Sequence, residues 1–356
     1  MRVIHITEAF GGGLRTAIVN YINATPQIEH TLFARTREAH VTTDIPSNSH
    51  LELYEGGLVG FYTSALRTVA RNDYDIVHLH SSFAGILRAF LPPSTRIAYS
   101  PHCYAMEDPR KSVRTTAYWA VERILAQRPQ LLTAVSPREI EVGNRLSRRM
   151  PARLVPNAAP TSHVALQSMS TSAEATHESA RPVIVMIGRI SDQKDPGYFA
   201  EVASILGDRY RFLWIGDGDE GREALVAAGV EITGWVAIDR AHELLASSSL
   251  YVHTAAWEGG PLATLEAADA GCPVICRDIP SMRSLGYELA GKTPRQTAAA
   301  IERYFADAEY RSEVEIASKG LLSTYSTERM ATDLVAAYSF ALEALGRRGS
   351  ARQPRG

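Results

Sequence analysis

The sequence predicts an α/β protein made of two doubly wound parallel-sheet domains that face each other across a cleft. Three observations lead to this fold class. The 356 residues exceed the usual size of one domain and fit two domains of roughly 150 residues each. Short apolar runs alternate with helical patterns, as they do in βαβ units. This alternation stops at a small, polar stretch in the middle of the chain and then starts again.

Composition and charge are those of an ordinary globular protein. Hydrophobic residues make up 45% and charged residues 21% of the chain. A formal net charge of -2 argues against nucleic acid as a partner. We expect a cytoplasmic protein, because the chain opens on a strand pattern without a signal peptide and holds no apolar run of about 18 residues. Cys103, Cys272 and Cys276 show neither disulfide nor metal spacing.

The first predicted domain spans residues 1–159. Its strands are expected at Arg2–Thr7, Thr31–Ala34, Asp75–His80, Arg96–Ser100, Leu131–Val135 and Arg153–Val155. Its helices are expected at Leu14–Ile22, Gly60–Asn72 and Val113–Gln127. Right-handed crossovers between such strands would give an open sheet with helices on both faces.

The second half of the chain repeats the pattern after a flexible linker at 160–181. A second domain at 182–327 has expected strands at Val183–Gly188, Arg211–Gly216, Val230–Thr233, Leu250–Thr254 and Pro273–Cys276. Its helices are expected at Gly197–Leu206, Glu220–Ala228, Ala241–Ser247 and Pro294–Tyr304. A last helix at 328–346 would pack back on the first domain, and a basic, disordered tail would cover 347–356.

The segment between Glu258 and Glu266 is the strongest candidate for a binding site. It reads Glu-Gly-Gly-Pro-Leu-Ala-Thr-Leu-Glu and lies between a predicted strand and a helix of small residues. Pro261 suits the first turn of that helix, and two glycines before it let backbone N–H groups approach a ligand. A helix N-terminus favours an anion, whereas two carboxylates accept hydrogen bonds from hydroxyls. A nucleotide sugar combines both chemistries.

Two further candidate loops each follow the first predicted strand of a domain. Gly188-Arg-Ile-Ser-Asp-Gln-Lys194 places Arg189 and Lys194 at a strand end, where paired cations suit a diphosphate that gains charge on leaving. Gly11-Gly-Gly13 follows the first strand of the chain and lacks the G-x-G-x-x-G spacing. A plain tight turn explains that triplet as well as a ligand-binding loop does.

One histidine is singled out by its place. His102 comes just after the predicted strand Arg96–Ser100, where it can donate a hydrogen bond to a sugar or support charge. His78 and His80 are interpreted as strand-end residues, and no role is assigned to them. Of the two D-x-D pairs, the one at 217–219 is interpreted as a turn and helix N-cap, and the one at 73–75 lies just before a strand. No set of histidines, cysteines and carboxylates has metal-ligand spacing, so no metal site is predicted.

In their order along the chain, these pieces resemble the GT-B glycosyltransferases of family 4, and the resemblance covers nearly the whole length. It rests on the Gly-rich loop, His102, Val135-Ser136, Val155-Pro-Asn157, Gly-Arg-x4-Lys, Gly216-Asp-Gly, and Glu258 with Glu266 as an E-x7-E motif continued by Ala270-Gly-Cys-Pro-Val-Ile275. The sequence departs from the family after this run, where Arg277-Asp-Ile-Pro replaces a common glycine-rich turn.

The resemblance implies two Rossmann-like domains and a retaining transferase that uses a UDP- or GDP-sugar, without an essential metal or other cofactor. The acceptor would be a glycan, a lipid-linked sugar or a small molecule, in surface polysaccharide or glycoconjugate biosynthesis. The implied catalytic residues are His102, Arg189, Lys194 and Glu258. The implied donor-binding residues are Gly12, Gly13, Gly188, Arg189, Lys194, Trp235, Glu258, Gly259, Gly260, Pro261, Leu262 and Glu266. Glu266 would hold the ribose, and Trp235 the base.

Three other functions are weighed against this one. A nucleotide-sugar epimerase of the same fold would need acid and base residues on both sides of the sugar. A NAD-dependent oxidoreductase would need the missing G-x-G-x-x-G. A catalytically silent binding protein would not need the full set of charged residues. The helix at 110–123 combines basic and aromatic residues, so we weigh peripheral membrane contact against an ordinary amphipathic helix.

Overall fold

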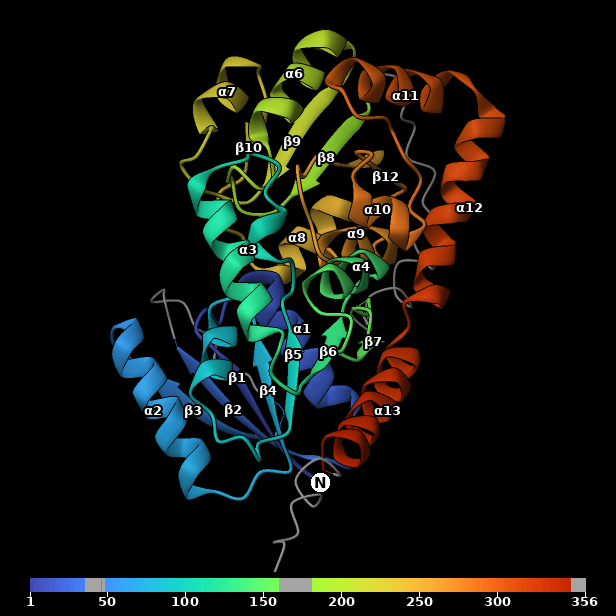
Figure 1. The fold of residues 1–356 in the computed structure, drawn as a ribbon. Helices are drawn as coiled ribbons and strands as arrows, with labels where there is room; N and C mark the ends of the chain where they lie inside the picture. Colours follow the sequence, from blue (N-terminus) through green and yellow to red (C-terminus); the bar gives the residue numbers. More distant parts are fainter. Residues whose placement is uncertain (36–45, 47–48, 160–180, 347–356) are drawn as a thin grey trace, which may run out of the picture. The chain divides into compact units, whose positions relative to one another are not determined.

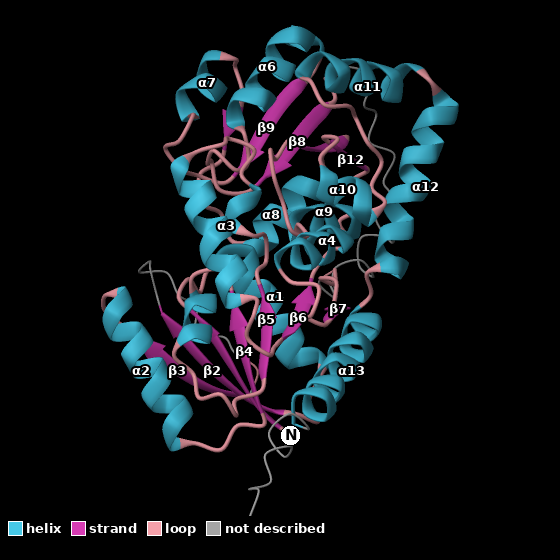
Figure 2. Cartoon of the chain, viewed as in Figure 1, coloured by secondary structure: helices cyan, strands magenta, loops and turns pink. Residues whose placement is uncertain are grey.

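The computed structural model describes residues 1–35, 46, 49–159 and 181–346, and it divides into two compact units (Figure 1). Unit 1 comprises Met1–Ala158 and Thr327–Gly356, and unit 2 comprises Ala159–Ser326. Both units are α/β structures with parallel sheets, as predicted (Figure 2). The predicted tail lies outside the described residues, as does all but the last residue of the predicted linker.

Unit 1 is built on a seven-stranded parallel sheet in the order β3-β2-β1-β4-β5-β6-β7. The strands are β1 (Arg2–Thr7), β2 (Glu29–Arg35), β3 (Ser49–Tyr54), β4 (Ile76–His80), β5 (Ile97–Ser100), β6 (Leu131–Ala134) and β7 (Ala152–Leu154). In the central register, His5 of β1 lies opposite His78 of β4, and Thr7 lies opposite His80. This alignment brings polar side chains together inside the sheet.

Helices cover the sheet of unit 1. They are α1 (Gly12–Ala24), α2 (Leu58–Arg71), α3 (Val113–Leu125), α4 (Pro137–Leu146) and α13 (Thr327–Gly346), with 3-10 turns η1 (Ala84–Ala89) and η2 (Ala105–Glu107). The helix α13 packs on α1 and on strands β4 to β7, so the end of the chain completes the core of unit 1. Leu334 and Tyr338 of α13 are fully buried in this core beside Ile76 and Leu131.

Unit 2 has a five-stranded parallel sheet in the order β10-β9-β8-β11-β12. Its strands are β8 (Val183–Ile187), β9 (Arg211–Ile215), β10 (Glu231–Ile232), β11 (Leu250–His253) and β12 (Val274–Cys276). Its helices are α6 (Pro196–Leu206), α7 (Arg222–Ala227), α8 (Ile238–Ala246), α9 (Leu262–Asp269), α10 (Pro280–Leu285), α11 (Pro294–Ala306) and α12 (Ala308–Thr324), with the 3-10 turn η3 (Gly207–Arg209).

The parallel arrangement of unit 2 places its candidate loops together. Strands β8, β9 and β11 are neighbours or next neighbours in the sheet, and their carboxyl ends share one edge. Ligands of doubly wound sheets bind at this edge. The loops after β8 and β11 contain the Gly-Arg-x4-Lys and E-x7-E motifs, respectively. None of the helices in the described residues is long and apolar enough to cross a membrane.

Candidate active site

The turn into α9 forms the centre of the site in unit 2. The chain leaves β11 at His253, passes Glu258 and two glycines, and enters α9 at Leu262. Pro261 is the N-cap of α9, with φ -71° and ψ 121°, so the prediction that it lies within the first helical turn is off by one residue. The first N–H groups of α9 have no acceptor within the helix, which makes them available to an anion.

Glu258 is buried and paired. Its side chain is 8% exposed and forms an ion pair with the Lys194 ammonium, while His253 Nε2 lies 3.5 Å from its Oε1. The Tyr251 hydroxyl in turn lies 3.0 Å from His253 Nδ1. Burial alone would raise the pKa of Glu258, but Lys194 and His253 outweigh it and hold the pKa at about 2. Glu258 is therefore a permanent anion that fixes Lys194.

Glu266 is a different kind of carboxylate. It lies on α9, is partly buried, and has no hydrogen-bond partner for its side chain among the residues that the structure describes. Burial raises its pKa, and the nearby His242 and Lys194 counteract that rise. Its oxygens can accept hydrogen bonds from an incoming ligand without breaking any bond described within the protein.

Glycines shape the floor of this site by close backbone approach. Gly216 has φ +138°, and a Cβ there would lie 2.2 Å from the Gly188 carbonyl oxygen. Gly218 has φ +143° and meets the Ile190 carbonyl in the same way, at 2.3 Å. The loops after β8 and β9 are thus in direct contact, which only glycine permits at these positions.

The predicted residues of unit 2 fall into two groups. Lys194 contacts Glu258 and lies against Gly188, where an added Cβ would be 3.2 Å from Lys194 Cε. Arg189 and Trp235 are both exposed, and Trp235 is 63% exposed after Gly234, whose φ is +72°. Lys194 is thus in contact with Glu258 and next to Gly188, whereas Arg189 and Trp235 lie at the surface.

In unit 1, the glycine loop opens α1. Gly11 is the N-cap with an extended φ of -169°, and Gly12 has φ +52° at the start of the helix. Gly11, Gly12 and Gly13 are exposed, and a Cβ at Gly12 would meet no atom within 4 Å. The positive φ at Gly12 favours glycine, and the space beside it is open among the described residues.

His102 occupies a strained loop after β5. Its φ is +49° and that of Cys103 is +87°, both unusual for residues with side chains. The Cys103 N–H donates to Glu139 Oε1 at 2.7 Å, and the Val135 N–H donates to Glu139 Oε2 at 2.8 Å. His102 Nε2 lies 2.9 Å from His80 Nδ1. Burial lowers the pKa of His102 to about 4, so its ring is neutral near pH 7.

Sequence reasoning missed three residues that hold the loops after β4 and β5. Glu139 stands three positions after Ser136, a spacing that resembles a capping box. The Ser136 side chain caps α4, yet the Glu139 carboxylate binds Val135 and Cys103 instead. Glu8 accepts hydrogen bonds from the Ser81 hydroxyl and the Ala84 N–H at 2.5 and 3.2 Å. His80 ends β4, as predicted, and its ring is a direct partner of His102, a contact that the sequence did not reveal.

Comparison with known proteins extends these observations. Residues 12–163 match the family described as Glycosyltransferase Family 4, and residues 181–307 match Glycosyl transferases group 1. An uncharacterised 41.2 kDa protein in the cps region of Klebsiella pneumoniae is 26% identical over 79% of this chain and 82% of its own length. The UDP-Gal:alpha-D-GlcNAc-diphosphoundecaprenol alpha-1,3-galactosyltransferase of Escherichia coli is 27% identical over 61% of each chain.

Solved structures share the fold at low identity. Sucrose-phosphate synthase from Thermosynechococcus elongatus matches with a TM-score of 0.77 and 15% identity, covering 97% of this chain and 100% of the other. Anabaena HepE in complex with UDP and glucose matches with a TM-score of 0.73 and 15% identity, covering 95% and 99%. The likeness of the two parallel-sheet units to these structures shows the GT-B fold. The chain belongs to the family 4 glycosyltransferases, as the two matches along its length show.

Proposed function

We propose that this chain is a retaining glycosyltransferase that takes a sugar from a UDP- or GDP-sugar without an essential metal. The observation that carries the proposal is the pair of unlike carboxylates around α9. Glu258 forms an ion pair with Lys194, whereas the carboxylate oxygens of Glu266 have no described hydrogen-bond partner. A ligand that is both an anion and a polyol uses both features, and a nucleotide sugar is such a ligand.

Each part of the donor has a candidate partner in unit 2. Glu266 would accept hydrogen bonds from the ribose hydroxyls, and Trp235 would stack on the base. The backbone N–H groups of Gly259, Gly260 and Leu262 would bind phosphate at the start of α9. Arg189 and Lys194 would offset the charge that develops on the diphosphate, which is the task that a metal performs in other transferases.

Retention follows from the proposed bond changes. The bond between the sugar carbon and the donor phosphate oxygen breaks, and the nucleoside diphosphate leaves with that electron pair. The acceptor hydroxyl bonds to the same carbon from the same face and gives its proton to the departing phosphate oxygen. Glu258 is an unsuitable nucleophile, because its ion pair with Lys194 stabilises the carboxylate as it is. His102 would contact a hydroxyl of the transferred sugar.

For the acceptor, we propose a glycan or lipid-linked sugar in surface polysaccharide biosynthesis. The names of two relatives, one in a cps region and one acting on a diphosphoundecaprenol-linked sugar, support this pathway. The helix α3 supports contact with a membrane surface that would carry such an acceptor. Its apolar side chains are exposed to 89% at Val113, 42% at Trp119 and 72% at Ile124, near Arg110 and Lys111.

The donor proposal is tested by nucleotide binding and turnover in EDTA. A panel of UDP-, GDP- and ADP-sugars should contain one donor that the protein hydrolyses or transfers with the anomeric configuration kept. Glu266→Gln should raise the Kd of the matching nucleotide about 10- to 100-fold, because hydrogen bonds to a charged acceptor are lost. Glu223→Gln, an exposed change on α7, is the charge-matched control. Failure of every sugar to bind would refute the proposal.

Membrane contact is tested separately by co-sedimentation with vesicles that contain anionic lipid. We expect Trp119→Ser with Ile124→Ser to reduce the bound fraction of the protein several-fold, since buried apolar area drives such binding. Val59→Ser is a suitable control, because Val59 is 78% exposed on α2 and lies outside α3. Equal binding of all three proteins would remove the membrane proposal and leave the donor proposal untouched.

A further inference from the structure

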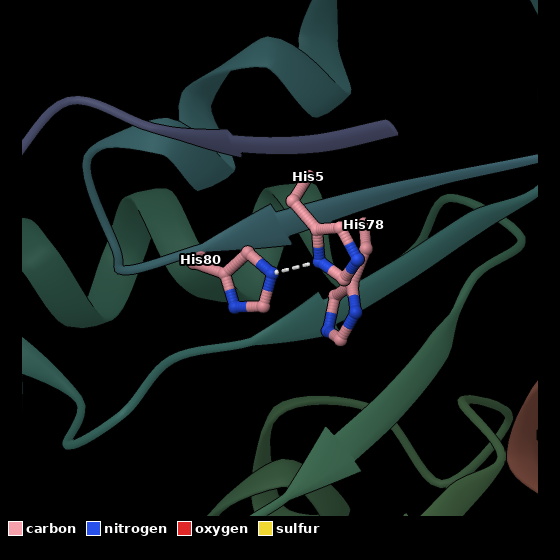
Figure 3. A group of neighbouring side chains, drawn as sticks. All are labelled: His5, His78 and His80. Atoms are coloured by element: carbon pink, nitrogen blue, oxygen red, sulfur yellow. Dashed lines mark hydrogen bonds between the residues drawn. The ribbon is translucent and has the colours of Figure 1, made fainter. Parts of the chain in front are cut away.

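Four histidines of unit 1 form a continuous hydrogen-bonded chain. His30 Nδ1 lies 3.0 Å from His5 Nε2, His5 Nδ1 lies 2.9 Å from His80 Nε2, and His80 Nδ1 lies 2.9 Å from His102 Nε2. The middle bond, between His5 and His80, is drawn in Figure 3. The histidine chain (His30, His5, His80, His102) crosses the neighbouring strands β2, β1 and β4 and ends in the loop after β5.

The far end of the histidine chain fixes where its protons lie. His30 Nε2 lies 3.2 Å from the Thr25 carbonyl oxygen and 3.0 Å from Thr25 Oγ1. The Thr25 hydroxyl already donates its only proton to the Tyr21 carbonyl oxygen at 2.7 Å. Both groups of Thr25 can therefore only accept from His30. It follows that His30 carries its proton on Nε2 and accepts a hydrogen bond at Nδ1.

When all four rings are neutral, every hydrogen bond in the histidine chain has the same donor-to-acceptor direction. Burial lowers the pKa of His30 and His102, and it places that of His5 and His80 well below the ordinary value. No carboxylate among the described residues is hydrogen-bonded to any of the four rings. A neutral imidazole has one N–H, so each ring donates from Nε2 and accepts at Nδ1. His102 is left with a lone pair at Nδ1.

We propose that His30, His5 and His80 are positioning residues that hold His102 as the Nε2–H tautomer and present its Nδ1 as an acceptor to a ligand hydroxyl. The inference rests on the proposed contact between His102 and a sugar. No hydrogen bond to His102 Nδ1 occurs within the described ranges. This acceptor role of His102 replaces the expectation that His102 donates a hydrogen bond to the sugar. The histidine chain does not carry protons away, because the Thr25 carbonyl group at its end cannot take up a proton.

A metal site is the competing explanation for these histidines. One ring nitrogen from each of His5, His78 and His80 could act as a ligand, and these atoms all lie within 4.8 Å of one another. However, His78 Nδ1 lies 2.8 Å from the Tyr338 hydroxyl, and His78 Nε2 lies 2.9 Å from Ser100 Oγ. Both nitrogens of His5 and of His80 are used in the histidine chain. A metal would have to displace these bonds, so the geometry favours the hydrogen-bonded chain.

The test uses a matched pair of variants at the end remote from His102. Asparagine and leucine have nearly the same shape, but only H30N supplies an oxygen that accepts from His5 Nε2–H. Nitrogen-15 NMR of histidine-labelled full-length protein reports the tautomer of each ring, and H102Q assigns the His102 signals. We expect a single Nε2–H form of His102 in the wild type and in H30N. H30L should give a mixture of both tautomers.

Activity and metal content provide further readouts. H30L should lower kcat/KM about 3- to 10-fold more than H30N does, as expected for one misaligned hydrogen bond. If H30L does not fold, the pair H80N and H80L applies the same comparison next to His102. An Nδ1–H or mixed His102 in the wild type would overturn the inference. So would an unchanged His102 tautomer in H30L, or one equivalent of bound Zn²⁺ that shifts the His5 and His80 signals.

These outcomes are separable from the donor proposal. The tautomer is measured without substrate, so a protein that binds no nucleotide sugar can still show the predicted His102 form. Conversely, a working transferase with the same His102 tautomer in H30N and H30L would refute this inference alone.

Discussion

The ion pair between Lys194 and Glu258 allows a prediction with a calculated size. The pKa of Glu258 lies at about 2 instead of 4.5, and both side chains are less than one-fifth exposed. At about 1.4 kcal/mol for each pKa unit, the folded state gains about 3 kcal/mol from this carboxylate at pH 7. We expect Glu258→Gln to lose roughly that amount, in line with the cost of breaking a buried ion pair.

The pH dependence has a defined direction. Because folding lowers the pKa of Glu258, its contribution is complete above the ordinary value of 4.5 and disappears as the pH falls toward 2. At pH 3.5 the wild type should have lost about 1.4 kcal/mol of this contribution. The difference in unfolding free energy between wild type and Glu258→Gln should therefore shrink from about 3 kcal/mol at pH 7 to about 2 kcal/mol at pH 3.5.

Urea unfolding of the full chain, followed by tryptophan fluorescence, measures this difference. Three of the four tryptophans, Trp214, Trp235 and Trp257, lie in unit 2 and report mainly on it. Glu223→Gln again serves as the control and should show a small, pH-independent effect. A Glu258→Gln variant as stable as the wild type at pH 7 would refute the reasoning. A difference of the same size at pH 7 and pH 3.5 would refute the role of the lowered pKa.

Two further predictions concern the loops around this pair. Trp235→Ala should weaken nucleotide binding about 10-fold or more in calorimetry, because base stacking on an aromatic ring contributes about 1–3 kcal/mol, while stability stays unchanged since the ring is 63% exposed. An unaltered Kd would exclude Trp235 from the base site. Gly216→Ala should lower the stability of unit 2 by about 1–3 kcal/mol in the urea assay, because its Cβ would meet the Gly188 carbonyl oxygen at 2.2 Å. Gly320→Ala in α12, where a Cβ meets nothing within 4 Å, is the control, and equal effects of both changes would contradict the proposed clash.

The fold could be predicted where apolar runs are buried on both faces. Strands β1, β4 and β8 are such runs, and their predicted and observed bounds differ by at most one residue. Strand β3 was missed although its Ser49–Tyr54 sequence alternates polar and apolar residues, because it is a partly exposed edge strand without a continuous apolar run. The helix α12 was missed because serines, threonine and Gly320 interrupt its apolar pattern.

The candidate residues of unit 2 could be picked out in the sequence because their motifs are local. Glu258 and Glu266 flank one helix start, and Lys194 follows Gly188 in one loop. The ion pair between Lys194 and Glu258 joins residues 64 positions apart, so their distance became known only from the structure. Glu139 escaped notice because its partners, Val135 and Cys103, are backbone N–H groups, which leave no pattern in a sequence.

The histidine chain of unit 1 also depends on contacts between residues that are distant in the sequence. His5 lies opposite His78 in the register of two parallel strands, but its ring is hydrogen-bonded to His80 on one side and to His30 on the other. In the sequence they are single histidines in apolar strands, each of which reads as an ordinary core residue. Only the order β2-β1-β4 turns them into a connected chain that ends at His102.

Arg189 and Lys194 looked equivalent in the sequence, but the structure gives them different surroundings. Lys194 is already neutralised by Glu258, so a bound diphosphate would have to share its charge with that carboxylate. Arg189 follows the end of β8 and is exposed. The N–H groups at the start of α9 add positive partial charge without a counter-ion. In the proposed donor site, the start of α9 would therefore offset part of the diphosphate charge beside Arg189 and Lys194, because Lys194 also balances Glu258.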